Sequence, residues 1–451
     1  MKIVIIGSGK VGRAIVEHIS KEGHDLCVID KNTKVVEELI NSFDISGVLG
    51  NGASYEIQKK AEVDKADIVI TTTSSDEVNI LACLVAKKLG AKNTIARIRN
   101  HEYYQQVNFM KKDLGLSMII NPEQEAANEI VRMLDFPQAL KIDTFSKGRI
   151  SLIELFIGKD SPLVGDTLQV IRQKYPYQVL VCAVQRGENV FIPKGDFIIE
   201  ANDKIHITAP RDEIVKFLSK LGYIDKKLSS VMVVGGGKIS NYLVQKLVKN
   251  KYRVKVIEVD EKRCYELGEL FPDATIICGD GADQDLLVDE GIESTDALVS
   301  LTGMDEENII ISMYASNIKV PKVISKVNRD GFAGMLQSTG IASVVSAKNI
   351  AAVRVVRYVR ALSNSRGSNV VTLYKLVNNQ VEALEFAVNS KALCIDKTLK
   401  ELKLKKGILI AAIIRNNEVI IPDANSCIKL NDSVIVVTNN PYLDNLNDIL
   451  A

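Results

Sequence analysis

The sequence lacks long hydrophobic runs and an excess of charge of either sign. No run approaches the roughly 18–20 apolar residues that cross a membrane, and the apolar run near the N-terminus, Ile3–Ile6, is too short for a signal peptide. Lys and Arg number 57 and Asp and Glu number 56, which argues against the broad basic surface of a nucleic-acid-binding protein. We therefore expect a cytosolic protein with no nucleic-acid partner.

The cysteines have neither the number nor the spacing of a disulfide framework or a zinc site. The seven are widely spaced, and none forms a CxxC pair or lies beside a pair of His residues. Most lie inside apolar segments, as Cys27 and Cys278 do. We expect reduced cysteines that pack in the interior, and no metal site.

What the sequence does contain is an internal repeat that runs through the whole chain. Val4–Val11 returns as Met232–Ile239, 228 residues later. Other short segments return 229 residues later: Gly50–Ala53 as Gly279–Ala282, Thr73–Asn79 as Thr302–Asn308, Arg186 as Arg415, and Asn202-Asp203 as Asn431-Asp432. The chain of 451 residues is thus predicted to be a tandem duplication of a unit of about 225 residues.

Each unit changes character partway along. Its first part alternates short Val/Ile-rich runs with amphipathic stretches of helical period, which predicts a doubly wound parallel sheet with helices on both faces. Its second part has short strands with polar turns between them, which predicts a small α+β module. The predicted fold class is therefore α/β, with Rossmann-like domains at 1–136 and 229–360 and small domains at 140–222 and 370–451.

A glycine-rich loop follows the first predicted strand. Gly7-Ser8-Gly9-Lys10-Val11-Gly12 fits the G-x-G-x-x-G fingerprint, in which the glycines permit a tight turn, close approach of a pyrophosphate, and close packing of helix on strand. Asp30 ends the next strand, where its carboxylate would accept hydrogen bonds from an adenine ribose. That carboxylate would repel a 2′-phosphate, so NADP is disfavoured.

The second copy of this loop departs from the fingerprint at its last position. Gly235-Gly236-Gly237-Lys238-Ile239 is followed by Ser240, which adds a side chain where the pattern has none. Glu258 aligns with Asp30 and supplies the same acceptor on a longer side chain. A second nucleotide site of different affinity is expected, and a degenerate copy retained for its shape is the alternative.

Further repeated residues lie at the carboxyl ends of predicted strands, where such folds bind their ligands. Gly50-Asn51-Gly52 follows the third strand, and Thr72-Thr73-Ser74 follows the fourth. Thr73 or Ser74 could cap the helix that Asp76 opens. Arg97, with Lys326 as its counterpart, places a cation near each phosphate site. Plain helix capping and ordinary surface charge are the structural alternatives.

Taken together, these motifs resemble the RCK (KTN) regulatory domains of potassium transport systems, and the resemblance covers essentially the whole chain. The residues that carry it are Gly7–Gly12, Asp30, Gly50–Ala53, Thr73–Glu77 and Ile95–Arg99. The tandem arrangement resembles the peripheral subunits of Trk-type potassium uptake. It implies a homo-oligomeric ring of RCK domains at the inner face of the cell membrane, docked on a separate potassium-translocating membrane subunit.

The resemblance also implies the ligand and the residues that bind it. The ligand is NAD or NADH, or the adenine nucleotides ATP and ADP, and its exchange would rearrange the domains and gate the membrane partner without catalysis. The implied residues of the first cleft are Gly7, Ser8, Gly9, Lys10, Val11, Gly12, Asp30, Asn51, Gly52, Thr73, Ser74 and Arg97. Those of the second are Gly235, Gly236, Gly237, Lys238, Ile239, Glu258, Asp280, Thr302 and Lys326.

Two predicted helices after the sixth strands carry opposite charge. The first has acidic residues at Glu123, Glu125 and Glu129, and the second has basic residues at 348, 354, 357 and 360. Helices at this place form domain pairs in the family that the chain resembles, so the opposite charges favour contact between the two halves. A solvated face is the alternative.

The main alternative function is an NAD-dependent oxidoreductase. Hydride transfer to a carbonyl usually needs a positioned acid or base, most often His. The chain has only His18, His24, His101 and His206, none of them repeated in the other half. His101, close to Arg97 and Arg99, is the strongest catalytic candidate. We predict a protein that is not an enzyme, with the oxidoreductase and a scaffold without ligand binding as alternatives.

Overall fold

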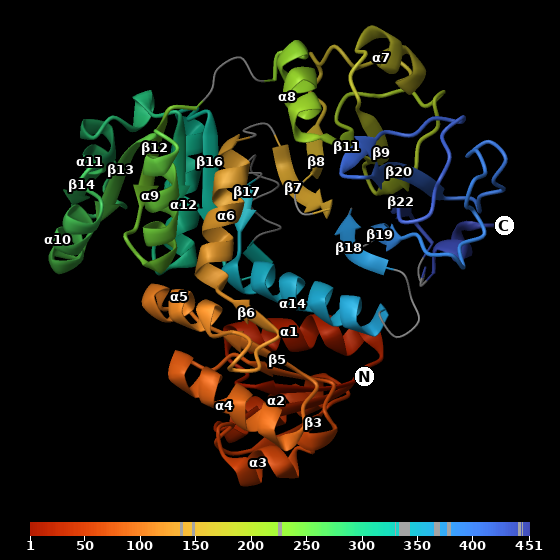
Figure 1. The fold of residues 1–451 in the computed structure, drawn as a ribbon. Helices are drawn as coiled ribbons and strands as arrows, with labels where there is room; N and C mark the ends of the chain where they lie inside the picture. The colour runs from red at the N-terminus through yellow and green to blue at the C-terminus, as the bar shows by residue number, and fades with distance from the viewer. Residues whose placement is uncertain are drawn as a thin grey trace. The chain divides into compact units, whose positions relative to one another are not determined.

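The computed structural model describes residues 1–135, 139–146, 149–223, 228–329, 331–332, 343–364, 370–376, 380–440, 443 and 445–451. Their contacts divide the chain into two compact units. The first unit comprises Met1–Val131 and Ser230–Val359, and the second comprises Arg132–Ser229 and Arg360–Ala451. Each unit is therefore assembled from one part of each repeat (Figure 1).

The first half of the first unit is a six-stranded parallel sheet in the order β3-β2-β1-β4-β5-β6. Its strands are β1 (Lys2–Ile6), β2 (Asp25–Asp30), β3 (Ser46–Leu49), β4 (Ile68–Thr71), β5 (Asn93–Arg97) and β6 (Met118–Ile120). Its helices are α1 (Lys10–Ile19), α2 (Thr33–Ser42), α3 (Tyr55–Lys60), α4 (Asp76–Leu89), α5 (His101–Phe109) and α6 (Pro122–Asp135).

Helices cover both faces of this sheet because its strands are apolar on both faces. Val4 and Val69 belong to a buried cluster with Ala82 of α4. The opposite face of β3 packs against α2, since a Cβ on Gly47 would lie 2.6 Å from Cγ1 of Val36. The predicted doubly wound sheet is confirmed.

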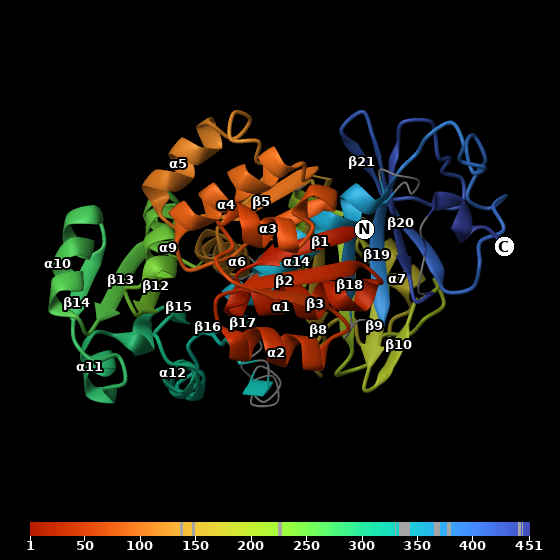
Figure 2. The same ribbon diagram turned by 90° about the horizontal axis from the view of Figure 1, so that it is seen from below.

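The second half of the first unit repeats this topology with the order β14-β13-β12-β15-β16-β17. Its strands are β12 (Ser230–Val234), β13 (Arg253–Glu258), β14 (Thr275–Cys278), β15 (Ala297–Ser300), β16 (Lys322–Lys326) and β17 (Ser343–Val345). Its helices include α9 (Lys238–Lys249), α10 (Glu261–Leu270), α11 (Gln284–Asp289), α12 (Asp305–Asn317) and α14 (Ala347–Asn364). Figure 2 shows α9 and α10 on one side of the sheet and α11 and α12 on the other. The tandem duplication is thus confirmed.

The second unit holds two antiparallel sheets, β10-β9-β11-β8-β7 and β18-β19-β22-β20-β21. The first has β7 (Ala139–Phe145), β8 (Ile150–Phe156), β9 (Leu180–Arg186), β10 (Asn189–Phe191) and β11 (Lys204–Pro210), with helices α7 (Leu168–Lys174) and α8 (Arg211–Lys220). The second has β18 (Val370–Leu376), β19 (Val381–Ala387), β20 (Ile408–Arg415), β21 (Glu418–Ile420) and β22 (Ser433–Thr438). The first is the predicted small α+β module, and the second repeats its antiparallel sheet, with the 3₁₀ turn Leu446–Ile449 as the helical element among the described residues after β18.

The two small modules share a hydrophobic cluster. Leu152 and Cys182 of one pack with Val381 and Ile435 of the other. Glu385 is only 4% exposed, and it accepts hydrogen bonds from the hydroxyls of Ser146 and Ser433. Apolar burial and a satisfied buried carboxylate therefore join the modules.

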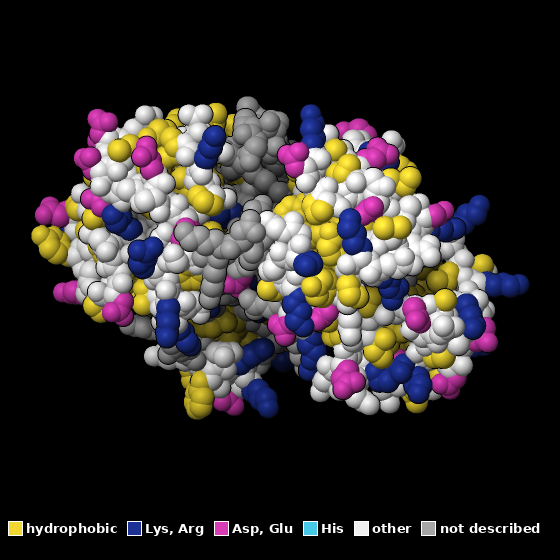
Figure 3. Space-filling view, turned by 90° about the horizontal axis from the view of Figure 1, so that it is seen from above, with side chains coloured by type: hydrophobic (Ala, Val, Ile, Leu, Met, Phe, Trp, Pro, Cys, Tyr) yellow, Lys and Arg dark blue, Asp and Glu magenta, His cyan; other side chains and the backbone are white. Residues whose placement is uncertain are grey.

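The charges on the surface and the character of the helices agree with two features of the sequence, its near-zero net charge and its lack of long hydrophobic runs. On the face shown in Figure 3, Lys and Arg side chains are interspersed with Asp and Glu side chains. Among the described residues, no helix is both long enough and apolar enough to cross a membrane. Within the same residues, no group of three or more His, Cys, Asp or Glu side chains could hold a metal ion.

Candidate functional site

Each parallel sheet has a glycine loop in which some positions pack tightly against the protein and another faces open space. Gly7 has a φ of +90°, and a Cβ there would lie 2.7 Å from the backbone nitrogen of Thr73. A Cβ on Gly12 would lie 2.1 Å from the carbonyl oxygen of Gly7. At Gly9 and Gly237, the described part of the chain places no non-neighbouring atom within 4 Å of such a Cβ. In the first loop, the first and third positions need glycine for packing, and in both loops the second position leaves room for a ligand. The second loop has Ser240 at its third position.

Both loops lead directly into a helix. Gly9 and Gly237 are the N-cap residues of α1 and α9, and a glycine has no side chain with which to accept from the first helical N–H groups. These N–H groups and the positive end of the helix dipole form a natural site for a phosphate. Lys10 and Lys238 open the two helices.

The two predicted ribose-binding carboxylates are held by the glycine loops. Oδ2 of Asp30 accepts the backbone N–H of Ser8 at 2.6 Å. Oε2 of Glu258 accepts the backbone N–H of Gly236 at 2.5 Å. Each carboxylate also accepts one N–H from its own turn, at 2.9 Å. The longer Glu258 side chain therefore reaches the same loop position as Asp30.

The turn after the third strand lies against the first strand. A Cβ on Gly52 would lie 2.0 Å from Cγ2 of Ile6, so only glycine fits there. Oδ1 of Asn51 accepts the backbone N–H two residues on, at 3.3 Å. Asp280 makes the corresponding contact in the second half, at 2.9 Å.

The expectation that Thr73 or Ser74 caps α4 is wrong by one or two residues. Oγ of Ser75 accepts the N–H of Val78 at 3.2 Å and is the cap. The hydroxyl of Thr73 donates instead to Oδ1 of Asn79 at 2.8 Å, and Ser74 is exposed.

A buried asparagine holds the ends of two strands together in each half. Asn79 is fully buried, and its Nδ2 donates to the carbonyl oxygens of Arg97 at 2.9 Å and Thr73 at 3.3 Å. Asn308 makes the same two bonds, to Lys326 and Thr302. Sequence reasoning did not assign a role to this residue, although it ends one of the repeated segments.

Both predicted cations already have partners. An Nη of Arg97 lies 3.6 Å from Oε1 of Glu123, and both side chains are largely buried. Burial lowers the pKa of Arg97, and Glu123 partly offsets this effect. Nζ of Lys326 donates to the carbonyl oxygens of Thr302 and Leu301, and burial lowers the pKa of Lys326 as well.

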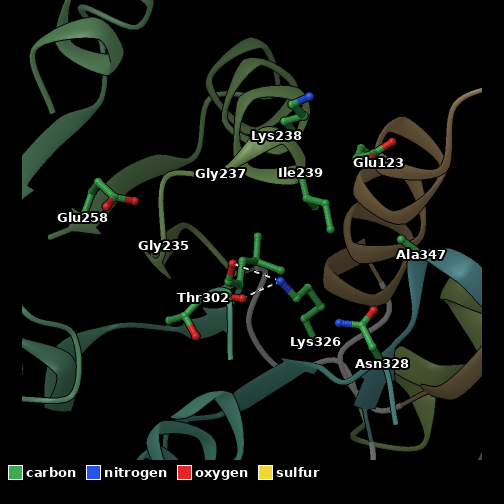
Figure 4. A pocket seen from close by; sticks show the side chains of 12 residues that line it. Glu123, Gly235, Gly237, Lys238, Ile239, Glu258, Thr302, Lys326, Asn328 and Ala347 are labelled. Carbon is green, nitrogen blue, oxygen red and sulfur yellow. Dashed lines mark hydrogen bonds between the residues drawn. The ribbon is translucent and has the colours of Figure 1, made fainter. Parts of the chain in front are cut away.

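The second half contains a cavity of about 360 Å³ at these strand ends (Figure 4). That volume is within the range of small-molecule sites, about 300–1,000 Å³. Its lining includes seven predicted residues: Gly235, Gly237, Lys238, Ile239, Glu258, Thr302 and Lys326. The other lining residues are Glu123, Leu301, Gly303, Asn328 and Ala347, and Gly236 and Asp280 lie outside the lining. The residues therefore fit a phosphate-bearing ligand with a ribose.

Glu123 comes from the other half of the unit, and only its acidity marked it in the sequence. The halves contact each other through α6. Nδ2 of Asn121 donates to the hydroxyl of Tyr242 at 2.9 Å, and that hydroxyl donates to the carbonyl oxygen of Arg99 at 3.0 Å. Glu125 and Arg354 form an ion pair. The predicted contact between oppositely charged helices is therefore confirmed at this pair.

None of the lining residues of the cavity is a histidine. His206 is buried in β11 of the second unit, His18 lies in α1, and His24 precedes β2. His101 begins α5, and its side chain lies outside the described residues.

Comparison with known proteins finds two kinds of domain, each of which matches the chain twice. The TrkA-N domain matches residues 3–122 and 231–347, and the TrkA-C domain matches 152–222 and 383–451. The "Trk system potassium uptake protein TrkA" of Vibrio alginolyticus is 30% identical over 99% of this chain and 98% of its own length.

Two solved structures have the same fold at low sequence identity. The "GsuK channel bound to NAD" superposes with a TM-score of 0.63 and 16% identity, over 97% of this chain and 76% of that chain. A crystal structure of GsuK bound to ADP superposes with a TM-score of 0.51 and 13% identity, over 79% of this chain and 68% of that one. At these identities the likeness concerns the fold alone.

Proposed function

Because this chain belongs to the family of TrkA-N and TrkA-C domain proteins, we propose that it is a regulatory subunit that senses a nucleotide and gates a separate potassium-translocating membrane protein. The subunit binds at the inner face of the membrane through that partner and works as a homo-oligomer. The names of its relative and of the two similar structures support potassium transport and NAD or ADP as ligands.

One observation carries the nucleotide part of this proposal. Each half has a glycine with open space above it, Gly9 or Gly237, beside a carboxylate that the loop holds in place, Asp30 or Glu258. A helix N-terminus for phosphate and a carboxylate for ribose are the two contacts that an adenine nucleotide needs. We therefore assign NAD or NADH, or ATP or ADP, to both clefts.

Gating requires that the ligand bind two arrangements of the domains unequally, because equal affinity shifts no equilibrium. Couplings of about 1–3 kcal/mol are typical and bias a gate roughly five- to 150-fold. The Asn121–Tyr242 bond and the Glu125–Arg354 pair connect the two halves. They supply contacts that a bound nucleotide would strengthen or weaken.

We propose no catalysis by this chain. Two polar side chains of the cavity are engaged in structural bonds, Lys326 with strand-end carbonyls and Thr302 with Met304, and the lining residues include no histidine. An oxidoreductase would need a group free to exchange a proton with a bound substrate.

Calorimetric titration of NAD, NADH, ATP and ADP tests the proposal. The proteins are the unmodified chain, Asp30→Ala, Glu258→Ala, and the exposed matched controls Asp64→Ala and Glu293→Ala. We expect two binding events, each abolished by substitution of its own carboxylate and retained in the controls. Absence of binding to the unmodified chain contradicts nucleotide sensing, and steady turnover of NADH with a small carbonyl compound would favour the oxidoreductase.

The gating step needs a second measurement. Potassium flux through vesicles that contain a Trk-type membrane subunit is compared with and without this chain, each at saturating nucleotide. We expect the chain to change the flux, and the nucleotide to change the size of that effect. A flux that is indifferent to the chain contradicts the proposed partner.

A further inference from the structure

Two cysteines of the second half lie against Glu258, which lines the cavity (Figure 4). Sγ of Cys264, at the start of α10, donates to the carbonyl oxygen of Glu258 at 3.2 Å. Cys278 ends β14 and pairs with Glu258 in the parallel register. The backbone N–H that follows it, that of Gly279, donates to the same carbonyl oxygen at 2.9 Å. The two cysteines therefore meet beside the residue that supplies the ribose-binding carboxylate.

The thiols of Cys264 and Cys278 are neighbours in different surroundings. Cys264 is buried, whereas Cys278 is exposed, against the expectation that it packs in the interior. Burial and the adjacent Cys278 thiol raise the pKa of Cys264 to about 12. Because the thiolate is the reactive form, Cys264 is a poor nucleophile at neutral pH, and Cys278 meets an oxidant from solvent first.

The pair of thiols belongs to one half of the duplication. Val36 in α2 takes the place of Cys264 in α10, since the backbone N–H of each donates to the carbonyl oxygen of the N-cap residue of its helix. Leu49 ends β3 as Cys278 ends β14. The fold therefore needs no sulfur at either position, because aliphatic side chains fill both in the first half.

The start of α10 is bonded both to the glycine loop and to the carboxylate of Glu258. Nε of Arg263, the residue before Cys264, donates to the carbonyl oxygen of Gly236 at 2.8 Å. The backbone N–H of Asp260, the N-cap of α10, donates to Oε1 of Glu258 at 2.9 Å. A movement of Cys264 therefore displaces groups that position the phosphate-binding loop and the ribose-binding carboxylate.

We propose that Cys264 and Cys278 form an oxidative modification site, at which a peroxide produces a disulfide that weakens nucleotide binding to the second cleft. The part that concerns the nucleotide rests on the proposed function. The first half has no such pair, so its cleft is insensitive to the same oxidant.

The reaction consumes one hydrogen peroxide for each disulfide. The thiolate of Cys278 attacks one peroxide oxygen, the O–O bond breaks, and the hydroxide released takes up the proton that the thiol lost, leaving a sulfenic acid and water. The sulfur of Cys264 then attacks the sulfur of Cys278, and the S–O bond breaks. The hydroxyl group leaves with the Cys264 proton as a second water.

The disulfide changes the start of α10. An S–S bond is about 2.05 Å long, so Sγ of Cys264 gives up its hydrogen bond to Glu258 and the start of α10 moves toward β14, the strand beside it in Figure 2. The bonds from Arg263 to the loop and from Asp260 to the carboxylate are then strained. Both contacts proposed for the nucleotide weaken together.

Peptide mapping without reductant tests the modification itself. The full chain is treated with hydrogen peroxide, alkylated, digested and analysed by mass spectrometry. We expect a link between Cys264 and Cys278 that dithiothreitol removes. In Cys264→Ser, a cyclic 1,3-diketone should label the sulfenic acid of Cys278, whereas in Cys278→Ser it should leave Cys264 unlabelled. Absence of the link overturns the site, and label on Cys264 overturns the order of attack.

Calorimetric titration of NAD in the Asp30→Ala protein tests the effect on the second cleft. We expect oxidation to lower the affinity at least about fivefold, and dithiothreitol to restore it. Cys278→Ser in the same protein should bind NAD equally before and after peroxide. Cys427→Ser removes a partly exposed cysteine of the second unit and should behave as its parent does. In the Glu258→Ala protein, oxidation should leave the first cleft unchanged.

The outcomes separate this inference from the proposed function. An unchanged NAD affinity in protein whose Cys264–Cys278 link has been mapped overturns the effect on the cleft and leaves nucleotide sensing intact. An equal loss of affinity in Cys278→Ser attributes the effect to another oxidised residue and also overturns it. If NAD does not bind the reduced Asp30→Ala protein, the proposed second nucleotide site fails, and the mapped link still decides the modification site.

Discussion

The hydroxyl of Ser240 donates a hydrogen bond to the carbonyl oxygen of Gly235, a bond that a different position supplies in the first half. There the equivalent carbonyl, that of Gly7, accepts from Thr72 at 2.5 Å. The second half has Leu301 where the first has Thr72. In the second half the hydroxyl donor therefore belongs to the helix and not to the end of the strand, so Ser240 compensates for the absence of the threonine.

This exchange predicts that Gly12→Ser is tolerated only together with a change at Thr72. A Cβ on Gly12 would lie 2.1 Å from the carbonyl oxygen of Gly7, which Thr72 already binds. We expect the single variant to lose about 2–3 kcal/mol of unfolding free energy. Gly12→Ser/Thr72→Leu reproduces the pair of the second half and should lose less. Strict additivity of the two single variants in denaturant unfolding would contradict the compensation.

Local sequence patterns predicted the fold well because the signals that determine it are themselves local. Strands buried on both faces are continuous apolar runs, and β1 and β12 are such runs. Because the two repeats match at a nearly constant offset, the fold predicted for the first repeat was predicted for the second as well. The glycine loops and the carboxylates Asp30 and Glu258 were also predictable, since loop and strand are close in the chain.

Contributions from distant segments could not be predicted in this way. Glu123 lines a cavity of the other half, more than 100 residues from Gly235 and Lys326, and no periodicity encodes that approach. Asn79 lies in a recognised repeat, but its bonds to two strand ends appear only when the sheet is assembled. The cap of α4 was misplaced because several hydroxyl residues stand in a row before the helix.

A repeated Arg–Asp pair in the small modules should contribute strongly to stability. Nε and Nη2 of Arg186 each lie 2.8 Å from the carboxylate oxygens of Asp203, whose side chain is fully buried. Arg186→Met leaves that carboxylate buried without its counter-charge, and we expect a loss of about 3–5 kcal/mol. The double variant Arg186→Met/Asp203→Asn should recover part of the lost free energy of unfolding. Equal losses in the single and the double variant, measured by denaturant unfolding, would exclude the buried charge as the cause.

Lys322 predicts a pH dependence of stability in the first unit. Burial lowers the pKa of Lys322 to about 8, whereas an unfolded lysine titrates near 10.4. The folded state therefore holds this proton less tightly, so the contribution of Lys322 to the free energy of unfolding rises as pH increases from about 8 to about 10. We expect Lys322→Met to stabilise the protein by about 2–3 kcal/mol at pH 7 and to lose this advantage by about pH 10.

The measurement is the difference in unfolding free energy between Lys322→Met and the unmodified protein at pH 7, 8, 9 and 10. Lys262→Met, at an exposed position in α10, is the control and should show no trend. A difference for Lys322→Met that stays constant over this pH range would show that packing, not the charge, determines the effect.

The ion pair between Glu125 and Arg354 should couple the two halves of the first unit. The Glu125 side chain is 15% exposed and that of Arg354 is 41% exposed, and burial lowers the pKa of Arg354. In a cycle of Glu125→Gln, Arg354→Met and the double variant, we expect a coupling free energy of about 1–2 kcal/mol. The matched control is the exposed pair Arg329–Glu306. We expect its coupling free energy to be about 1 kcal/mol or less, as is typical of exposed ion pairs.

The same cycle has a consequence for the second cleft. Glu125 and Glu123 lie in the first turn of one helix, α6, so weakening the attachment of that turn should make the position of Glu123 less defined. We expect Arg354→Met to weaken NAD binding to the second cleft a few-fold in the Asp30→Ala protein, although Arg354 is absent from the cavity lining. If the cycle shows coupling in stability but NAD affinity is unchanged, the ion pair joins the halves without positioning Glu123, and the two roles of α6 are independent.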